Sequence, residues 1–185
     1  MDEAPRPTIK GIFVKSHIRG LERERGAEGL RLLREKFGRP LNYGNGDDVP
    51  VADEVQILEH IVDILSGGSL SLHERHLAAG RLHFRNFSTT PLWKIVSFVF
   101  MGNTKRILMQ SARISGYVFR NVHFISESLD ERRVKITMFN NDYPLEHFQG
   151  FFQQWIAQAD LNGDVEAAAH TRGRYEYTIS WTSEH

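Results

Sequence analysis

Three histidines lie on one face of a predicted helix. His73, His76 and His83 recur at spacings of three and seven residues within residues 71–87, and this spacing suits metal binding or a pH-sensitive contact. A metal site needs at least three convergent ligands, yet His76 and His83 would lie about 10 Å apart along the helix axis. No further histidine or carboxylate has a matching spacing nearby. We therefore predict no metal site, expect packing against neighbouring elements, and assign this face no role.

A second polar group stands where another helix is predicted to begin. Asp142 and Glu146 are four residues apart and suit a pair of acid–base carboxylates, with Tyr143 and His147 beside them. Asp142 is already explained as the residue that caps the helix, and Glu146 and His147 are expected on its polar side. We therefore predict no catalytic residue. Instead, Asn141, Asp142, Tyr143, Glu146 and His147 are predicted to form a surface that binds a partner.

Several other kinds of chemistry are excluded by composition. The chain has no cysteine among its 185 residues, which rules out disulfides, zinc–thiolate sites and iron–sulfur ligation. The loop from Asn42 to Asp48 lacks the lysine and flanking elements of a phosphate-binding loop, and its carboxylates do not follow the calcium-loop pattern. We accordingly expect no cofactor.

Charge and hydropathy restrict the partners. The net charge is zero and no concentrated basic run occurs, so nucleic-acid binding is not expected. Residues 1–40 carry ten Lys/Arg against six Asp/Glu, whereas residues 140–185 carry two against seven. This asymmetry suits a basic protein partner or a head-to-tail homodimer, although ordinary solvated surface is the simpler explanation. The longest apolar run, Leu92 to Met101, is too short to span a bilayer. We expect a cytoplasmic protein.

The elements that position these groups follow from hydrophobic periodicity. Helical spacing predicts a helix from Lys10 that bends at residues 26–29, and further helices over residues 50–66, 71–87, 92–100 and 104–115. Gly116 is expected to mark a change to alternating strands, 118–125 and 134–139, with a turn over 127–132. A helix over 144–159 and strands 165–171 and 175–181 complete the chain. The pattern predicts an α+β fold, with a helical N-terminal half followed by a β-β-α-β-β unit containing a four-stranded antiparallel sheet.

We expect a flexible tail, residues 1–8, before a single domain, residues 9–182. Its helical part would cover about 10–115 and its sheet part about 116–181. Aromatic residues of two helices could wall an apolar pocket between these parts, although a filled core would use the same side chains. The predicted pocket residues are Trp93, Val96, Phe100, Phe148, Phe152 and Trp155.

Three strings carry a family resemblance. IKGIFVKSHIRGL, GRLHFRNFSTTPL and NNDYPLEHFQGFFQQW resemble a paralogous bacterial family, known mainly from myxobacteria and named only as a domain of unknown function (family 2378). The layout is more distantly similar to haem nitric-oxide/oxygen-binding domains and to 4-vinyl-reductase-type small-molecule-binding domains. The haem domains bind iron through a helix histidine and the propionates through a Tyr-x-Ser-x-Arg motif. Residues 91–115 contain no histidine and the motif is absent, as is the cysteine cluster of many vinyl-reductase-type domains.

The resemblance implies a non-catalytic bacterial regulatory domain. It would act as a signalling adaptor with a protein partner, or as a sensor of a small apolar ligand without haem. The alternatives are an enzyme of unknown reaction and a haem or gas sensor that uses an atypical ligand.

Overall fold

A computed structural model describes residues 5–100 and 103–182. The described chain is a mixed α+β fold, as predicted. In chain order its elements are β1 (Thr8–Lys10), α1 (Gly11–Phe37), β2 (Asp48–Pro50), α2 (Val51–Ser66), α3 (Leu72–Phe87), α4 (Pro91–Val99), α5 (Thr104–Met109), α6 (Ser111–Val118), β3 (Phe119–Arg120), β4 (His123–Asp130), β5 (Arg133–Phe139), α7 (Leu145–Gln158), β6 (Asn162–Thr171) and β7 (Arg174–Thr182).

In the helical half, individual residues determine where one helix bends and where two others begin. Gly26 adopts φ 60° and ψ −154° inside α1, which confirms the predicted bend, because a positive φ favours glycine. At the start of α3, Ser71 and Glu74 form a reciprocal capping box. Thr90 caps α4, and Pro91 occupies its first turn. These signals fix where α3 and α4 begin.

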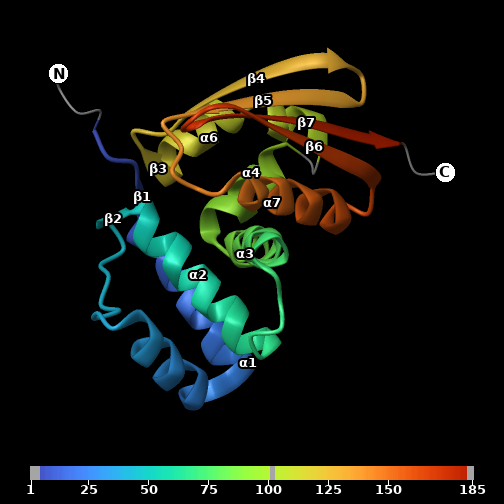
Figure 1. Cartoon of the computed structure of the whole chain (residues 1–185). Helices are drawn as coiled ribbons and strands as arrows, with labels where there is room; N and C mark the ends of the chain where they lie inside the picture. The colour runs from blue at the N-terminus through green and yellow to red at the C-terminus, as the bar shows by residue number, and fades with distance from the viewer. Residues whose placement is uncertain (1–4, 101–102, 183–185) are drawn as a thin grey trace.

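The predicted four-stranded antiparallel sheet is confirmed, with the order β4-β5-β7-β6. Helix α7 covers one face of this sheet and lies between it and α3 (Figure 1). Its aromatic stripe is buried on both sides, which explains why so many of its residues are apolar. The helices α1 and α2 extend away from the sheet on the far side of α3 (Figure 1).

Helices α3 and α7 approach closely because each has a glycine at the contact. A Cβ on Gly80 would lie 1.7 Å from the carbonyl oxygen of His147, and one on Gly150 would lie 2.1 Å from that of Leu77. The backbones therefore touch without intervening side chains. This contact determines how far the α3 histidines lie from α7.

The segment after α4 differs from the prediction. The predicted helix 104–115 is broken at Gln110 into α5 and α6, and α6 continues through Gly116 to Val118. The predicted strand 118–125 is two strands in different sheets, separated by Asn121 at φ 62°. The predicted turn at 127–132 was also wrong in part, because β4 continues to Asp130.

A second, small sheet of order β2-β1-β3 was not predicted, because its strands are too short to show alternation. Thr8 pairs with Pro50 and Arg120 within it, so the predicted tail ends before this residue. Residues 1–4 of that tail lie outside the described chain. Among the described helices, none combines the length and apolar character needed to cross a membrane.

Candidate functional site

Five polar side chains from separate parts of the fold meet in the interior. Glu54 of α2 is fully buried, with its Oε1 atom 2.8 Å from His17 Nε2 of α1 and 3.9 Å from His83 Nε2 of α3. The Tyr143 hydroxyl, from the loop before α7, donates a hydrogen bond to Glu54 Oε2. His83 Nδ1 lies 2.9 Å from His147 Nε2 of α7. We call these residues the buried polar cluster: His17, Glu54, His83, Tyr143 and His147.

Burial dominates the electrostatics of this cluster, because desolvation disfavours every charged form. It lowers the pKa of His17 to about 3. The pKa of His83 falls to about 4, with burial outweighing the nearby Glu54 carboxylate. Burial raises the pKa of Glu54 and, together with Glu54, that of Tyr143. The histidines are therefore neutral at pH 7. Burial likewise favours the protonated, neutral form of the Glu54 carboxyl.

An apolar cavity adjoins the cluster and has a volume of about 50 Å³. His83 belongs to both, and the other polar residues of the cavity wall are Ser111 and Ser115. The remaining eleven wall residues are apolar: Phe87, Trp93, Ile107, Ile114, Val118, Phe119, Phe124, Phe148, Phe151, Phe152 and Trp155. They come from α3 to α7 and from β3 and β4. The space suits a molecule of very few heavy atoms.

The predicted pocket residues fall into two groups. Trp93, Phe148, Phe152 and Trp155 line this one cavity. Val96 is buried but not part of the wall, and Phe100 lines a separate outer hollow beside α5. Most of the aromatic side chains instead pack on one another, as in the stacking of Phe84 on Trp155 with ring centroids 5.7 Å apart. Four of the six predicted residues thus line a small cavity, and their role as a ligand pocket stays a prediction.

The predicted partner surface was wrong for three of its five residues. Asn141, Tyr143 and His147 are each 1% exposed, because the loop before α7 folds inward and α7 faces α3 with His147. Asp142 is exposed and Glu146 half-buried. Asp142 does not cap α7 through its side chain. The five residues therefore do not form one surface.

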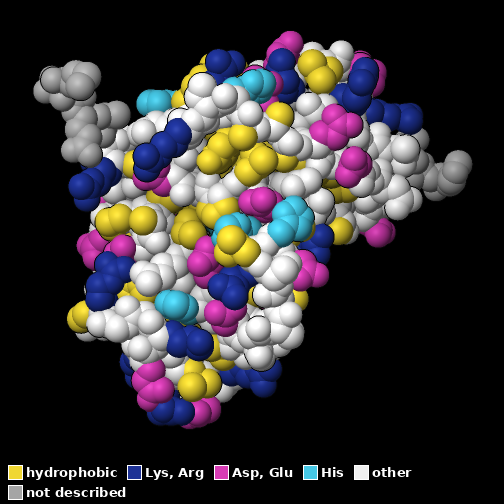
Figure 2. All heavy atoms as spheres, in the orientation of Figure 1, with side chains coloured by type: hydrophobic (Ala, Val, Ile, Leu, Met, Phe, Trp, Pro, Cys, Tyr) yellow, Lys and Arg dark blue, Asp and Glu magenta, His cyan; other side chains and the backbone are white. Residues whose placement is uncertain are grey.

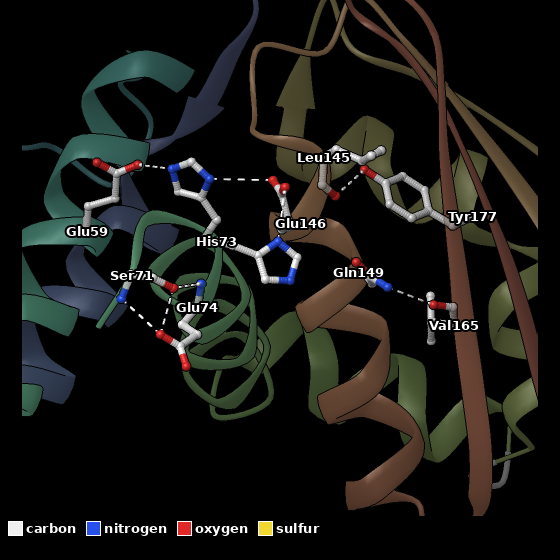
Figure 3. Close-up of polar contacts among 10 residues, drawn as sticks. Glu59, Ser71, His73, Glu74, Leu145, Glu146, Gln149, Val165 and Tyr177 are labelled. Atoms are coloured by element: carbon white, nitrogen blue, oxygen red, sulfur yellow. Dashed lines mark hydrogen bonds and ion pairs between the residues drawn. The ribbon is translucent and has the colours of Figure 1, made fainter. Parts of the chain in front are cut away.

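The three α3 histidines do not share one site: His73 and His76 contact Glu146, whereas His83 lies in the buried polar cluster. His73 Nδ1 lies 3.3 Å from Glu146 Oε1, and His76 pairs with Glu59 at 3.1 Å and with Glu146 at 3.5 Å. Figure 3 shows Glu146 of α7 directed toward α3. On the surface, histidine and acidic side chains gather along this α3–α7 seam (Figure 2). His83 is buried about two turns beyond His76, in the cluster.

Sequence reasoning missed His17 and Glu54, although a signal was present. His17 lies between Val14 and Leu21 at helical spacing, and Glu54 lies between Val51 and Leu58. Each is thus a polar residue on an apolar helix face. Glu54 also lies in the first turn of α2, where the positive end of the helix dipole favours a carboxylate, so its position alone does not mark it as unusual.

Comparison with solved structures gives the fold class. The chain is similar to a double-substitution variant of the Tt H-NOX domain (16% identity, TM-score 0.67, covering 94% of this chain and 95% of that one). It is also similar to the Fe(II) unliganded H-NOX protein from K. algicida (10%, 0.61, 95% and 97%). A third match is an oxygen-binding H-NOX domain related to soluble guanylate cyclases (13%, 0.60, 94% and 95%). The distant similarity of layout is therefore confirmed as an H-NOX-like fold.

The residues around the cavity do not fit a haem. Cavities that hold cofactors have volumes of about 300–1,000 Å³, whereas this one has about 50 Å³. Among the described residues, His83 is the one histidine of the wall, and its Nδ1 atom lies 2.9 Å from His147 Nε2. Within residues 5–100 and 103–182, no arginine or tyrosine lines the cavity to receive propionates.

A search of curated proteins found no match. A family model, however, matches residues 3–182, which is nearly the whole chain. Its extent agrees with the three strings that carry the resemblance in the sequence. The chain belongs to the family described as "Protein of unknown function (DUF2378)".

Proposed function

We propose that the chain is a non-catalytic regulatory domain that senses a small apolar ligand in the aromatic cavity, without haem. The observation that carries the proposal is the cavity itself, whose wall offers eleven apolar residues and three polar ones. Such a wall favours a ligand without charge, because a charged group would lose its hydration there without gaining a partner. One of the similar structures is an oxygen-binding H-NOX domain, which supports a small-ligand-binding role for this fold.

The chemistry of the buried polar cluster does not suit an enzyme active site. Its histidines are held neutral by burial and sit beside a carboxyl whose protonated form is favoured. The five groups are almost fully inaccessible to solvent, so a polar substrate has no route to them in this conformation. This arrangement supports a structural or ligand-linked role over acid–base turnover.

The adaptor, homodimer and cytoplasmic hypotheses stay predictions. The surface first assigned to a partner is largely buried, so an adaptor role needs another surface. Light scattering of the purified chain tests the homodimer, which predicts twice the mass of one chain.

Xenon under pressure is a direct probe of the cavity, because it binds dry apolar spaces. We expect saturable NMR shifts confined to methyl groups of the cavity wall, such as those of Ile107, Ile114 and Val118. Ser115→Leu would fill the space and abolish these shifts. The matched control is Ser128→Leu on the exposed part of β4, which should leave them unchanged. Shifts that persist in Ser115→Leu, or that spread over the surface, would contradict the proposal.

A further inference from the structure

Three ligand-type atoms converge at the centre of the buried polar cluster. One nitrogen each of His17 and His83 and one carboxylate oxygen of Glu54 all lie within 4.8 Å of one another. The Glu54 Oε1 atom is 2.8 Å from His17 Nε2 and 3.9 Å from His83 Nε2. The three residues come from α1, α2 and α3, so no spacing within one helix could have revealed them.

These separations are close to those around a bound metal ion. A tetrahedral ion with ligands at about 2.1 Å holds its donor atoms about 3.4 Å apart. The two distances from Glu54 Oε1 bracket this value, and the ligand atoms of the two histidines lie within 4.8 Å of each other, so the three side chains surround a space that one ion would occupy. Two histidines and one carboxylate form a donor set that suits divalent first-row transition metals and leaves coordination positions open.

The outer atoms of all three residues are already held by neighbours. Asn86 Nδ2 lies 3.3 Å from His17 Nδ1, His147 Nε2 lies 2.9 Å from His83 Nδ1, and Tyr143 donates to Glu54 Oε2. Metal-binding histidines and carboxylates in proteins are oriented in this way by second partners. A turn of the Asn86 amide would let its oxygen accept from His17 Nδ1, leaving Nε2 free for the ion.

A bound cation would also neutralise the negative charge of the buried Glu54 carboxylate. Within the described chain, the groups at ion-pair distance from this buried carboxylate are His17 and His83, and no lysine or arginine pairs with it. An unpaired buried carboxylate is costly, so it must be protonated or neutralised by a cation. The same contacts would serve a metal-free hydrogen-bond network, which is the competing outcome of the test below.

We propose that His17, Glu54 and His83 bind one divalent first-row transition-metal ion through two imidazole nitrogens and a carboxylate oxygen. This site is independent of the small-ligand proposal, since the cavity would bind an apolar molecule with or without the ion. The two adjoin at His83, which belongs to the cluster and to the cavity wall.

The test uses the full chain without a histidine tag. After treatment with EDTA and dialysis, the protein is incubated with Zn²⁺, Co²⁺ or, without oxygen, Fe²⁺. We expect about one equivalent of metal by elemental analysis and a rise in melting temperature, because an ion that binds only the folded state stabilises it. Bound Co²⁺ should show visible absorption of a nitrogen- and oxygen-ligated ion. Uptake below about a tenth of an equivalent for all three ions would overturn the proposal.

Substitutions then locate the metal. His17→Gln, Glu54→Gln and His83→Gln should each abolish uptake, whereas the matched controls His73→Gln and His76→Gln on the α3–α7 seam should retain it. Asn86→Ala should weaken affinity about 10- to 100-fold, because it removes a second partner. Loss of metal in the two controls with retention in Glu54→Gln would assign the ion to the surface and overturn the proposal. Should a cluster variant fail to fold, X-ray absorption of a Co²⁺-loaded double variant, His73→Gln with His76→Gln, decides. The seam then offers no histidine, so two histidine nitrogens on the ion assign it to the cluster, and their absence overturns the proposal.

Discussion

At the scale of single residues, the most consequential side chain is Glu54. It is fully buried on an otherwise apolar helix face, where its oxygens depend on His17 and Tyr143 for hydrogen bonds. Removing one partner of such a group leaves a buried acceptor unsatisfied. The resulting loss of stability exceeds the net contribution of an average hydrogen bond.

Tyr143→Phe tests this dependence because it deletes only the hydroxyl that donates to Glu54. We expect a loss of about 1–3 kcal/mol in the free energy of unfolding, measured by urea denaturation. The matched control is Tyr177→Phe, whose buried ring also loses one hydroxyl hydrogen bond, 3.0 Å to the carbonyl of Leu145. Because this acceptor is a backbone carbonyl, which has no charged form, Tyr177→Phe should lower the free energy of unfolding by less, about 1 kcal/mol. Equal losses of stability in the two variants would show that Glu54 depends on its hydrogen-bond donor no more than a backbone carbonyl does.

At the scale of elements, the contact between α3 and α7 sets the geometry of the site. Gly80 and Gly150 allow the two backbones to touch, which brings His83 and His147 within hydrogen-bond distance. A side chain at either position would force the helices apart, because the obstructing atoms are backbone.

We predict that Gly80→Ala and Gly150→Ala each destabilise the fold by about 3 kcal/mol or more, because the overlap cannot be relieved by a rotamer change. Gly116→Ala in α6 is the matched control, since a Cβ there meets nothing within 4 Å. Alanine should favour that helix by about 0.5–1 kcal/mol. Thermal unfolding of the three variants provides the measurement. A mild effect at Gly80 would mean that the helices separate easily in solution.

The contrast between predicted and observed elements has a physical origin. Helices such as α2 and α7 carry long apolar stripes, and their type and limits follow from local periodicity. The strands β1, β2 and β3 have two or three residues and are defined by pairing partners distant in the sequence. The buried polar cluster is likewise a product of tertiary packing, since its residues come from four helices and a loop. His83, Tyr143 and His147 were singled out from the sequence, whereas His17 and Glu54 were not.

At the scale of the whole molecule, the cluster lies where the helical half meets the α7-covered sheet. Helices α1, α2 and α3 contribute one residue each, while Tyr143 and His147 come from the sheet-bearing half. Protonation inside this junction therefore affects the stability of the entire fold. The buried histidines and Glu54 change the free energy of unfolding in opposite directions as the pH changes.

The pH dependence follows from the signs of the pKa shifts. The pKa values of His17, His83 and His147 are lowered by burial, so the unfolded chain binds more protons below pH 6.5 and stability falls on acidification. Each neutral histidine contributes a slope of up to about 1.4 kcal/mol per pH unit. The pKa of Glu54 is raised, so its contribution is fully present below pH 4.5 and is lost as pH rises above that value. Three groups outweigh one, so the free energy of unfolding should increase between pH 4.5 and 6.5.

Urea denaturation at intervals across this window measures the slope, with EDTA present to exclude any effect of bound metal. His147→Gln should reduce the slope by up to about 1.4 kcal/mol per pH unit, since glutamine binds no proton. The matched control is His123→Gln at the exposed start of β4, which should leave the slope unchanged. A flat profile in the wild type would mean that water reaches the cluster and hydrates its charged forms. A slope that changes equally in both variants would place the proton uptake outside the cluster.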